Sequence, residues 1–226
     1  MPQATRTTDT RQRILDAALD LFATEGYDAV SVERVASRVN IKAPSLYKHF
    51  RSKQDIFDTI VADMDRKHEE QAARLDLSLS AAQNDAASLA AMDEDELVQK
   101  VLSMVRFVVH DHHYQAFRKM MTIEQYKRPE LAQRYSERYL ELYLGYHARL
   151  FAQLMEVGAL PRDDAEAMAW QYFSPIVLAV GVMDRHPARE EEMEDLIRRH
   201  VHQFLRTHKP TKPSPANPTP QGAHHE

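Results

Sequence analysis

The chain has 226 residues, of which 43% are hydrophobic and 28% charged, and its formal net charge is −5 at pH 7. That length suits one large or two modest domains. No cysteine is present, which excludes disulfides, thiolate catalysis and cysteine-based zinc sites. No apolar run follows the N-terminus and the longest one, near residues 176–183, is too short to span a membrane. We therefore expect a cytoplasmic protein without a signal peptide or a membrane partner.

The charge is unevenly distributed along the chain. Residues 1–54 carry nine Lys and Arg against six Asp and Glu, which leaves 20 basic and 28 acidic residues in the remainder. A basic N-terminal part on an acidic body keeps any attraction for a polyanion local to the N-terminal part.

The first predicted helix follows a segment, residues 1–10, that we expect to be a flexible arm. Its apolar stripe repeats at helical spacing and consists of Ile14, Ala17, Ala18, Leu21 and Phe22. Gly26 is placed to end this helix.

A second short helix is predicted from Ser31 to Val39. Ser31 is a suitable N-cap, and valine and alanine recur behind it at helical spacing. Val39-Asn40-Ile41 then forms a turn, in which Asn40 tolerates a left-handed conformation.

The stretch 41–50 predicts a third helix of about two turns that is presented to a partner. Pro44 fits a first helical turn, and Leu46 and Phe50 share the inward face. Ser52 and Asp55 resemble a capping box that starts another helix at once. Helix, short turn and helix is the helix-turn-helix plan, whose second helix enters the DNA major groove.

Residues 11–60 resemble the DNA-binding domain of the tetracycline-repressor (TetR) family. The features that carry the resemblance are LF…EGY at the end of the first helix, SV…VA in the second, and SLYKHFRSK. Two positions depart from the family pattern, which usually has Gly where Asn40 stands and a small hydroxyl cap where Lys42 stands. Lys42 cannot accept a hydrogen bond as a cap, so the start of its helix is looser or Lys42 faces phosphate.

The resemblance implies two sets of DNA contacts. The residues implied to meet phosphates are Ser31, Tyr47, His49 and Lys53. The residues implied to lie nearest the bases are Lys42, Ala43, Pro44, Ser45 and Lys48.

A fourth helix is expected from Lys53 to about Leu75, because no Pro or Gly interrupts it. It joins the DNA-binding unit to the next domain. Residues 78–92 are small and polar and suggest a loose connection or a weak helix. Asp93-Glu94-Asp95-Glu96 is best explained as the first turn of a helix. The alternative is an acidic cluster that binds a metal ion.

The stretch His110-Asp111-His112-His113 is the most chemically suggestive one. Two histidines three apart could share a helix face with Phe117, but no third and fourth metal ligand follows at a recognisable spacing. We expect helix-boundary or pocket histidines and no metal or cofactor. The residues expected to line an effector pocket, in part as aromatic walls, are Phe107, His110, His113, Phe117, Tyr139, Tyr143, Trp170 and Phe173.

Further helices are predicted from Pro129 to Gly158, from Asp163 to Met183 and from Glu190 to Leu205. The last two resemble the pair that TetR-family members use in a two-fold dimer, although they could instead only close the monomer core. The expected interface residues are Ile176, Val180, Ile197 and Val201. The proline-rich tail 208–226 is expected to be disordered.

The sequence thus predicts an all-α protein of about nine helices. We expect a helix-turn-helix domain over residues 11–57 and a ligand-binding and dimerisation domain over residues 58–207. The resemblance implies a homodimeric transcriptional repressor that binds an inverted-repeat operator in double-stranded DNA and is released by an unknown small molecule. A regulator gated by a protein partner is the alternative. An enzyme is disfavoured, because the five glycines form no nucleotide-binding or nucleophile-elbow motif.

Overall fold

The computed structural model describes residues 3–74, 77, 82–127 and 129–208, and within them it is helical, without strands. The α-helical segments, eleven in number, are α1 (Gln3–Glu25), α2 (Val32–Arg38), α3 (Ala43–Leu46), α4 (Lys53–Arg74), α5 (Ala82–Ala91), α6 (Glu94–His110), α7 (His112–Glu124), α8 (Pro129–Ser136), α9 (Leu142–Glu156), α10 (Ala165–Arg185) and α11 (Glu190–Thr207). The π-helical turn η1 (Glu137–Glu141) joins α8 to α9, and the 3₁₀ turn η2 (Pro187–Arg189) precedes α11. The predicted all-α class is confirmed.

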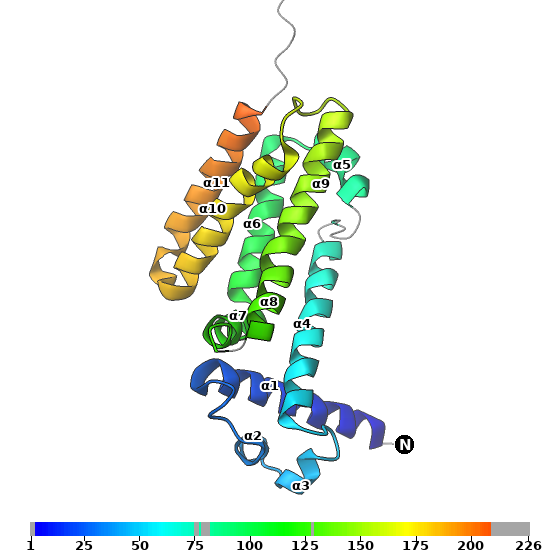
Figure 1. The fold of residues 1–226 in the computed structure, drawn as a ribbon, viewed down its shortest axis with the longest axis vertical. Coiled ribbons are helices and arrows are strands. Elements are labelled where there is room, and N and C mark those ends of the chain that lie inside the picture. The colour runs from blue at the N-terminus through cyan, green and yellow to red at the C-terminus, as the bar shows by residue number, and fades with distance from the viewer. Residues whose placement is uncertain (1–2, 75–76, 78–81, 128, 209–226) are drawn as a thin grey trace, which may run out of the picture.

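The molecule is elongated, with two parts arranged end to end (Figure 1). We call α1, α2, α3 and the first two turns of α4, as far as Ile60, the head, and the rest of α4 with the remaining helices the body. In the body, α6, α9, α10 and α11 run roughly along the long axis, and α7 lies across the end that meets the head (Figure 1). The helix α4 begins in the head and runs up beside the body.

Local signals fix most helix ends where the sequence predicts them. Gly26 ends α1 with a φ of 84°, and Gly158 follows α9 with a φ of 76°, a region that favours glycine. Asp93 caps α6 through a reciprocal capping box with Glu96. The acidic run after Met92 is therefore a helix start, as expected.

Two head helices differ from the prediction. The helix α1 begins at Gln3, because no Pro or Gly lies between Gln3 and Gly26, and so takes in most of the segment expected to be a flexible arm. The regular part of α3 covers only Ala43–Leu46, not two full turns. Beyond it the amides of Lys48 and His49 bond three residues back, at 3.3 and 2.8 Å, because the chain tightens before α4 starts.

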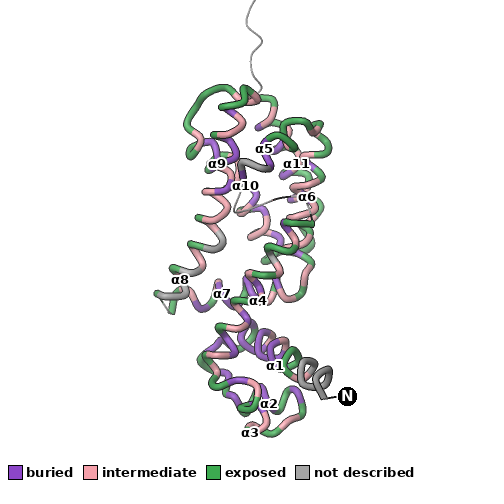
Figure 2. Tube along the Cα trace, turned by 90° about the vertical axis from the view of Figure 1, so that its right-hand side faces the viewer, coloured by how far each residue is buried: buried purple, intermediate pink, exposed green. Residues whose placement is uncertain are grey.

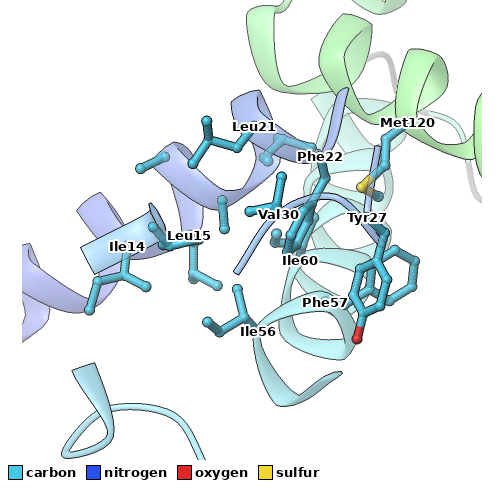
Figure 3. Packing of buried hydrophobic residues seen from close by; sticks show 14 of the residues in the cluster. Ile14, Leu15, Leu21, Phe22, Tyr27, Val30, Ile56, Phe57, Ile60 and Met120 are labelled. Carbon is cyan, nitrogen blue, oxygen red and sulfur yellow. The ribbon is translucent and has the colours of Figure 1, made fainter. Parts of the chain in front are cut away.

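The head core extends into the body. Buried side chains from α1, α2, α3 and α4 pack together, and Met120 of α7 points into the same cluster beside Phe22 and Tyr27 (Figure 3). Tyr114, Phe117 and Met121 of α7 belong to it as well. The head therefore shares one hydrophobic core with α7, which makes α7 a packed link between the two parts.

Two further hydrophobic clusters stabilise the body. One joins α5, α9, α10 and α11, and the other joins α6 to α10 and α11. Buried residues accordingly follow the inward faces of these helices (Figure 2). No helix among the described residues is long and apolar enough to cross a membrane. The expected disordered tail lies outside the described residues, except His208.

Candidate functional site

The far end of the head presents a compact polar surface around α3. Leu46 and Phe50 are buried and hold the segment to the head core, while Tyr47 is 52% exposed. Lys42, Pro44 and Lys48 are exposed as well, and Ala43, Ser45 and His49 are half-buried. All nine residues implied as DNA contacts belong to the head, and seven of them lie within 42–49, on this face or at its edge.

The turn before α3 is held by specific hydrogen bonds. Asn40 adopts a φ of 59°, the only positive φ of a non-glycine residue in the described chain. The guanidinium of Arg13 donates to the Val39 carbonyl at 2.9 Å, which ties the turn to α1. The exposed Ser31 caps α2 by accepting from the Arg34 amide at 3.2 Å. Lys42 stands at the N-cap of α3 without a side-chain cap, as its chemistry predicts.

Lys53 has a structural role that the sequence did not suggest. Its ammonium donates to the Tyr27 and Val30 carbonyls at 2.8 and 2.9 Å and lies 4.2 Å from the Tyr27 ring centroid. The start of α4 is thereby fixed to the loop between α1 and α2. A phosphate contact from Lys53 would add to these bonds.

Glu124, at the end of α7, joins the body to the head. Its side chain is fully buried, and its Oε1 accepts from the Tyr27 amide at 3.0 Å. Lys127 Nζ lies 3.5 Å from the same oxygen, and Oε2 has no hydrogen-bond partner among the described residues. The hydroxyl of Tyr27 in turn donates to Gln54 of α4 at 3.0 Å. One loop residue, Tyr27, therefore connects α7 with α4.

A large cavity lies where the head meets the body and has a volume of about 1090 Å³. Residues of α1 and α2 line it from the head, and residues of α6, α7 and α10 from the body. Arg118 stands in its wall and forms a bidentate ion pair with Asp184 of α10, with nitrogen–oxygen distances of 2.9 and 2.5 Å. Because Arg118 is buried, this pair holds α7 against α10.

The smaller cavity lies deeper in the body and has a volume of about 350 Å³. Helices α5, α6, α9, α10 and α11 surround it, and its wall is mainly apolar and aromatic. Tyr143 and Phe173 line both cavities, with their rings stacked at 5.3 Å between centroids. The two rings therefore form part of the partition between the cavities.

Tyr143 and Phe173 are the residues of the predicted effector set that reach a cavity. Phe117 of α7 belongs instead to the head core, and Phe107 of α6 packs against that core. Trp170 is 60% exposed on the outer face of α10. Tyr139 falls in η1, and its side chain lies outside the described part of the structure.

His110 and His113 are at a helix boundary, with Asp111 ending α6 and capping α7. His110 Nε2 lies 2.8 Å from Glu190, and His113 Nε2 lies 3.0 Å from Asp16. The two rings diverge to different helices, so they neither line a cavity nor share a ligand. Within the described residues no group of three or more His, Asp or Glu side chains is arranged to hold a metal ion.

The four residues expected at a dimer interface lie mostly inside the monomer. Ile197 and Val201 are 2% and 1% exposed, because the apolar face of α11 packs against α6. Ile176 is buried and Val180 half-buried in the same cluster. The large apolar side chains left exposed on this side are Trp170, Leu178 and Leu196.

Sequence reasoning missed three residues that the structure places at important positions. These are Glu124 between the parts and His147 and Tyr172 in the smaller cavity. A single histidine inside the apolar stretch 142–148 was a usable signal for the cavity. Glu124 gave none, because an acidic residue near a helix end is ordinarily solvated.

Two family models match the chain. One, described as bacterial regulatory proteins of the tetR family, matches residues 14–60. The other, described as AefR-like transcriptional repressor, C-terminal domain, matches residues 95–210, about half of the chain.

Individual proteins are similar over different parts. The biofilm operon icaADBC HTH-type negative transcriptional regulator IcaR of Staphylococcus aureus (strain Newman) is 43% identical over 51 residues, which cover 23% of this chain and 27% of IcaR. The chain thus aligns with about a quarter of that relative's length.

Solved structures with this fold include a SmeT–triclosan complex (TM-score 0.63, 16% identity), with 94% of this chain and 100% of that one covered. Another is FadR from Bacillus subtilis in complex with stearoyl-CoA (TM-score 0.61, 17% identity), with 86% and 97% covered. At these identities the likeness concerns the fold.

Proposed function

Because the chain belongs to the tetR family of bacterial regulatory proteins, we propose that it is a homodimeric transcriptional repressor released from its operator by a small molecule. The observation that carries the proposal is the exposed α3 surface at the end of an elongated molecule, held by Leu46 and Phe50 (Figure 1). Such a regulator acts in the cytoplasm, where it meets DNA. The divisions we propose are residues 11–57 for DNA binding and 58–207 for effector binding and dimerisation.

The chemistry of the α3 surface suits double-stranded DNA. The exposed cations of Lys42 and Lys48 and the hydroxyl of Tyr47 can meet phosphate oxygens and base edges. We propose that Ser31, Tyr47, His49 and Lys53 contact phosphates. Lys42, Ala43, Pro44, Ser45 and Lys48 lie nearest the bases in this proposal.

The dimer we propose uses the outer face of α10 and the adjoining edge of α11. Trp170 and Leu178 are 60% and 71% exposed on α10, and Leu196 is exposed on α11. Large apolar side chains left uncovered together favour an interface. A two-fold dimer would place two heads on successive major grooves of an inverted repeat, roughly 34 Å apart.

The cavities support control by a small molecule. Both border α10, and the larger one also borders the head, so a ligand there can change how head and body fit. The packed contacts of α7 and the bond from Tyr27 to Glu124 are the elements such a change would reach. SmeT with triclosan and FadR with stearoyl-CoA are proteins of this fold with small molecules bound.

The test is a gel-shift assay with the DNA upstream of the protein's own gene. Wild-type protein should shift that fragment at nanomolar concentration in the presence of competitor DNA, and Tyr47→Ala should weaken the shift. The variant Gln99→Ala, at an exposed position of α6, is the matched control that should bind like wild type. Equal binding to every fragment, unaffected by Tyr47→Ala, would contradict the proposal.

A further inference from the structure

The smaller cavity has a histidine in its aromatic wall. His147 of α9 lies with its ring centroid 5.0 Å from that of Tyr172 and 5.3 Å from that of Phe173. All three residues line the cavity. A polar ring in an otherwise apolar wall marks the place where a ligand would be oriented.

The protonation of His147 follows from its hydrogen bond. Nδ1 lies 2.8 Å from the Tyr143 carbonyl oxygen, which can only accept, so Nδ1 carries the hydrogen. Burial lowers the pKa of His147 to about 4, and the ring is therefore neutral near pH 7. Nε2 is then a bare acceptor, and it has no hydrogen-bond partner among the described residues.

Tyr172 supplies the complementary donor. Burial raises the pKa of its hydroxyl, so the proton stays on the oxygen. Its backbone carbonyl accepts from His200 Nε2 at 2.8 Å, whereas its hydroxyl makes no hydrogen bond to the described residues. The neighbouring Tyr146 differs, because its hydroxyl donates to Asp85 at 2.7 Å. The wall thus holds one unused acceptor and one unused hydroxyl on rings that touch.

The rest of the wall selects against charge. The side chains around the two polar groups include Leu150, Phe151, Leu154 and Phe204. The ionisable residues in the lining other than His147 and the tyrosines are Glu94, Lys100 and His208, and all three are partly exposed to solvent. A ligand in the interior therefore meets apolar surface and neutral polar groups, which disfavour an ionised group.

We propose that the smaller cavity takes an uncharged, mainly aromatic or aliphatic molecule with a hydroxyl group, which donates to His147 Nε2 and accepts from the Tyr172 hydroxyl. A hydroxyl is the simplest group that can do both. The volume, about 350 Å³, is near the lower end of the range for small-molecule pockets, about 300–1,000 Å³. We take this molecule to be the effector. That identification rests on the proposed function, whereas the binding chemistry does not.

Carboxylates are the class that the site rejects. A carboxylate offers only acceptors, which would face the bare Nε2 lone pair. One of its oxygens could accept from the Tyr172 hydroxyl, but Nε2 would then face a second acceptor unless His147 took up a proton in a site that disfavours the imidazolium.

Calorimetric titration of the full chain at pH 7.5 with three probes tests this chemistry. The probes are 2-naphthol, naphthalene and 2-naphthoate, which share one ring system and differ in the polar group. Wild type should bind 2-naphthol about tenfold more tightly than naphthalene. It should bind 2-naphthoate more weakly than either.

Two variants and one spectroscopic measurement locate the effect. In His147→Phe the preference for naphthol over naphthalene should fall to about twofold or less, and Tyr172→Phe should reduce it partly. In wild type labelled with ¹⁵N-histidine, naphthol should shift the Nε2 resonance of His147 and leave the ring neutral. This last measurement needs no variant, so it decides even if a substitution impairs folding.

The outcomes separate this inference from the proposed function. Tighter binding of naphthoate, equal binding of the three probes, or no binding would overturn the inference. Release of DNA by 2-naphthoate in a gel shift would also overturn the inference, because the proposed cavity rejects a carboxylate. It would still support a repressor that is released by an effector. A naphthol preference that depends on His147, without release of DNA, would support the cavity chemistry and count against its role in control.

Discussion

At the scale of single residues, the loop after α1 depends on a buried carboxylate from the body. The amide of Tyr27 donates to Glu124 at 3.0 Å, and both residues are buried. In Glu124→Ala this amide loses its partner, and the free energy of unfolding should fall by about 1–3 kcal/mol. Glu124→Gln keeps an acceptor in place and should stay within about 1 kcal/mol of wild type. Urea denaturation measures both values, and an alanine variant as stable as wild type would show that the bond contributes nothing.

Substitutions at Asn40 test the backbone conformation of the turn between α2 and α3. Its φ of 59° is costly for most side chains and free of cost for glycine. Asn40→Ala should lower the free energy of unfolding by about 1 kcal/mol, whereas Asn40→Gly, the family's usual residue, should be neutral or stabilising. The same denaturation assay compares the pair. A glycine variant less stable than the alanine variant would contradict the left-handed geometry.

His147 should make stability depend on pH. Its pKa is about 4 in the folded chain and near 6.5 when unfolded, so between those values the unfolded state binds more protons. Stability from this group is therefore complete above about pH 6.5 and is lost as pH falls towards 4, by about 3 kcal/mol in all. His147→Phe should lose less stability than wild type over that interval. Parallel pH curves for the two proteins would mean that His147 is not buried as a neutral ring.

At the scale of elements, the inner faces of α10 and α11 belong to the core of the body, whereas their outer faces form the proposed dimer interface. Leu178 is on the outside of α10, whereas Ile197 of α11 packs against α6. Leu178→Glu should give a folded monomer, because it places charge in the proposed interface only. Ile197→Asp should lower the free energy of unfolding by about 3 kcal/mol or more, because it buries an unpaired charge.

Light scattering after gel filtration, together with circular dichroism, separates these effects. Gln99→Glu, an exposed change on α6, is the control that should remain a folded dimer. A Leu178→Glu protein that stays dimeric would move the interface away from α10.

The elements themselves were largely predictable from the sequence. Stop signals such as Gly26 and Gly158 and the cap at Asp93 act locally, so they hold whatever the rest of the chain does. A stripe of apolar residues, by contrast, shows that a helix face is covered without showing what covers it. Ile197 and Val201 therefore looked like an interface and proved to be core.

The α3 surface and the cavities also differ in how far the sequence predicts them. The α3 surface follows from one continuous stretch, 42–49, so the sequence placed most of it. The cavities form between helices that are distant in the sequence, and Tyr143 of α9 and Phe173 of α10 line both. That depends on contacts between distant segments, and the sequence therefore found only part of their lining.

At the scale of the whole molecule, two helices connect the head to the body. The helix α4 spans both, and α7 contributes Tyr114, Phe117 and Met120 to the head core. An effector that shifts either helix should change the separation of the two heads in a dimer. A misfit state that the ligand prefers by about 1.4 kcal/mol lowers DNA affinity about tenfold.

Spin labels at Lys48 in both subunits measure that separation, since this side chain is exposed at the end of the head. The distance distribution should shift by a few ångströms when an effector found by screening is added. An unchanged distribution, with DNA still released, would point to a change in flexibility instead.

The most direct test of the account is the salt dependence of binding to an inverted-repeat operator, followed by fluorescence anisotropy. If each α3 surface and its surroundings neutralise roughly four phosphates, a dimer should show a slope of log K against log salt near about −7. Lys53→Ala should make that slope less steep by about one to two, since two phosphate-contacting lysines leave the complex. A wild-type slope shallower than about −2 would mean that this surface does not meet DNA in the way proposed.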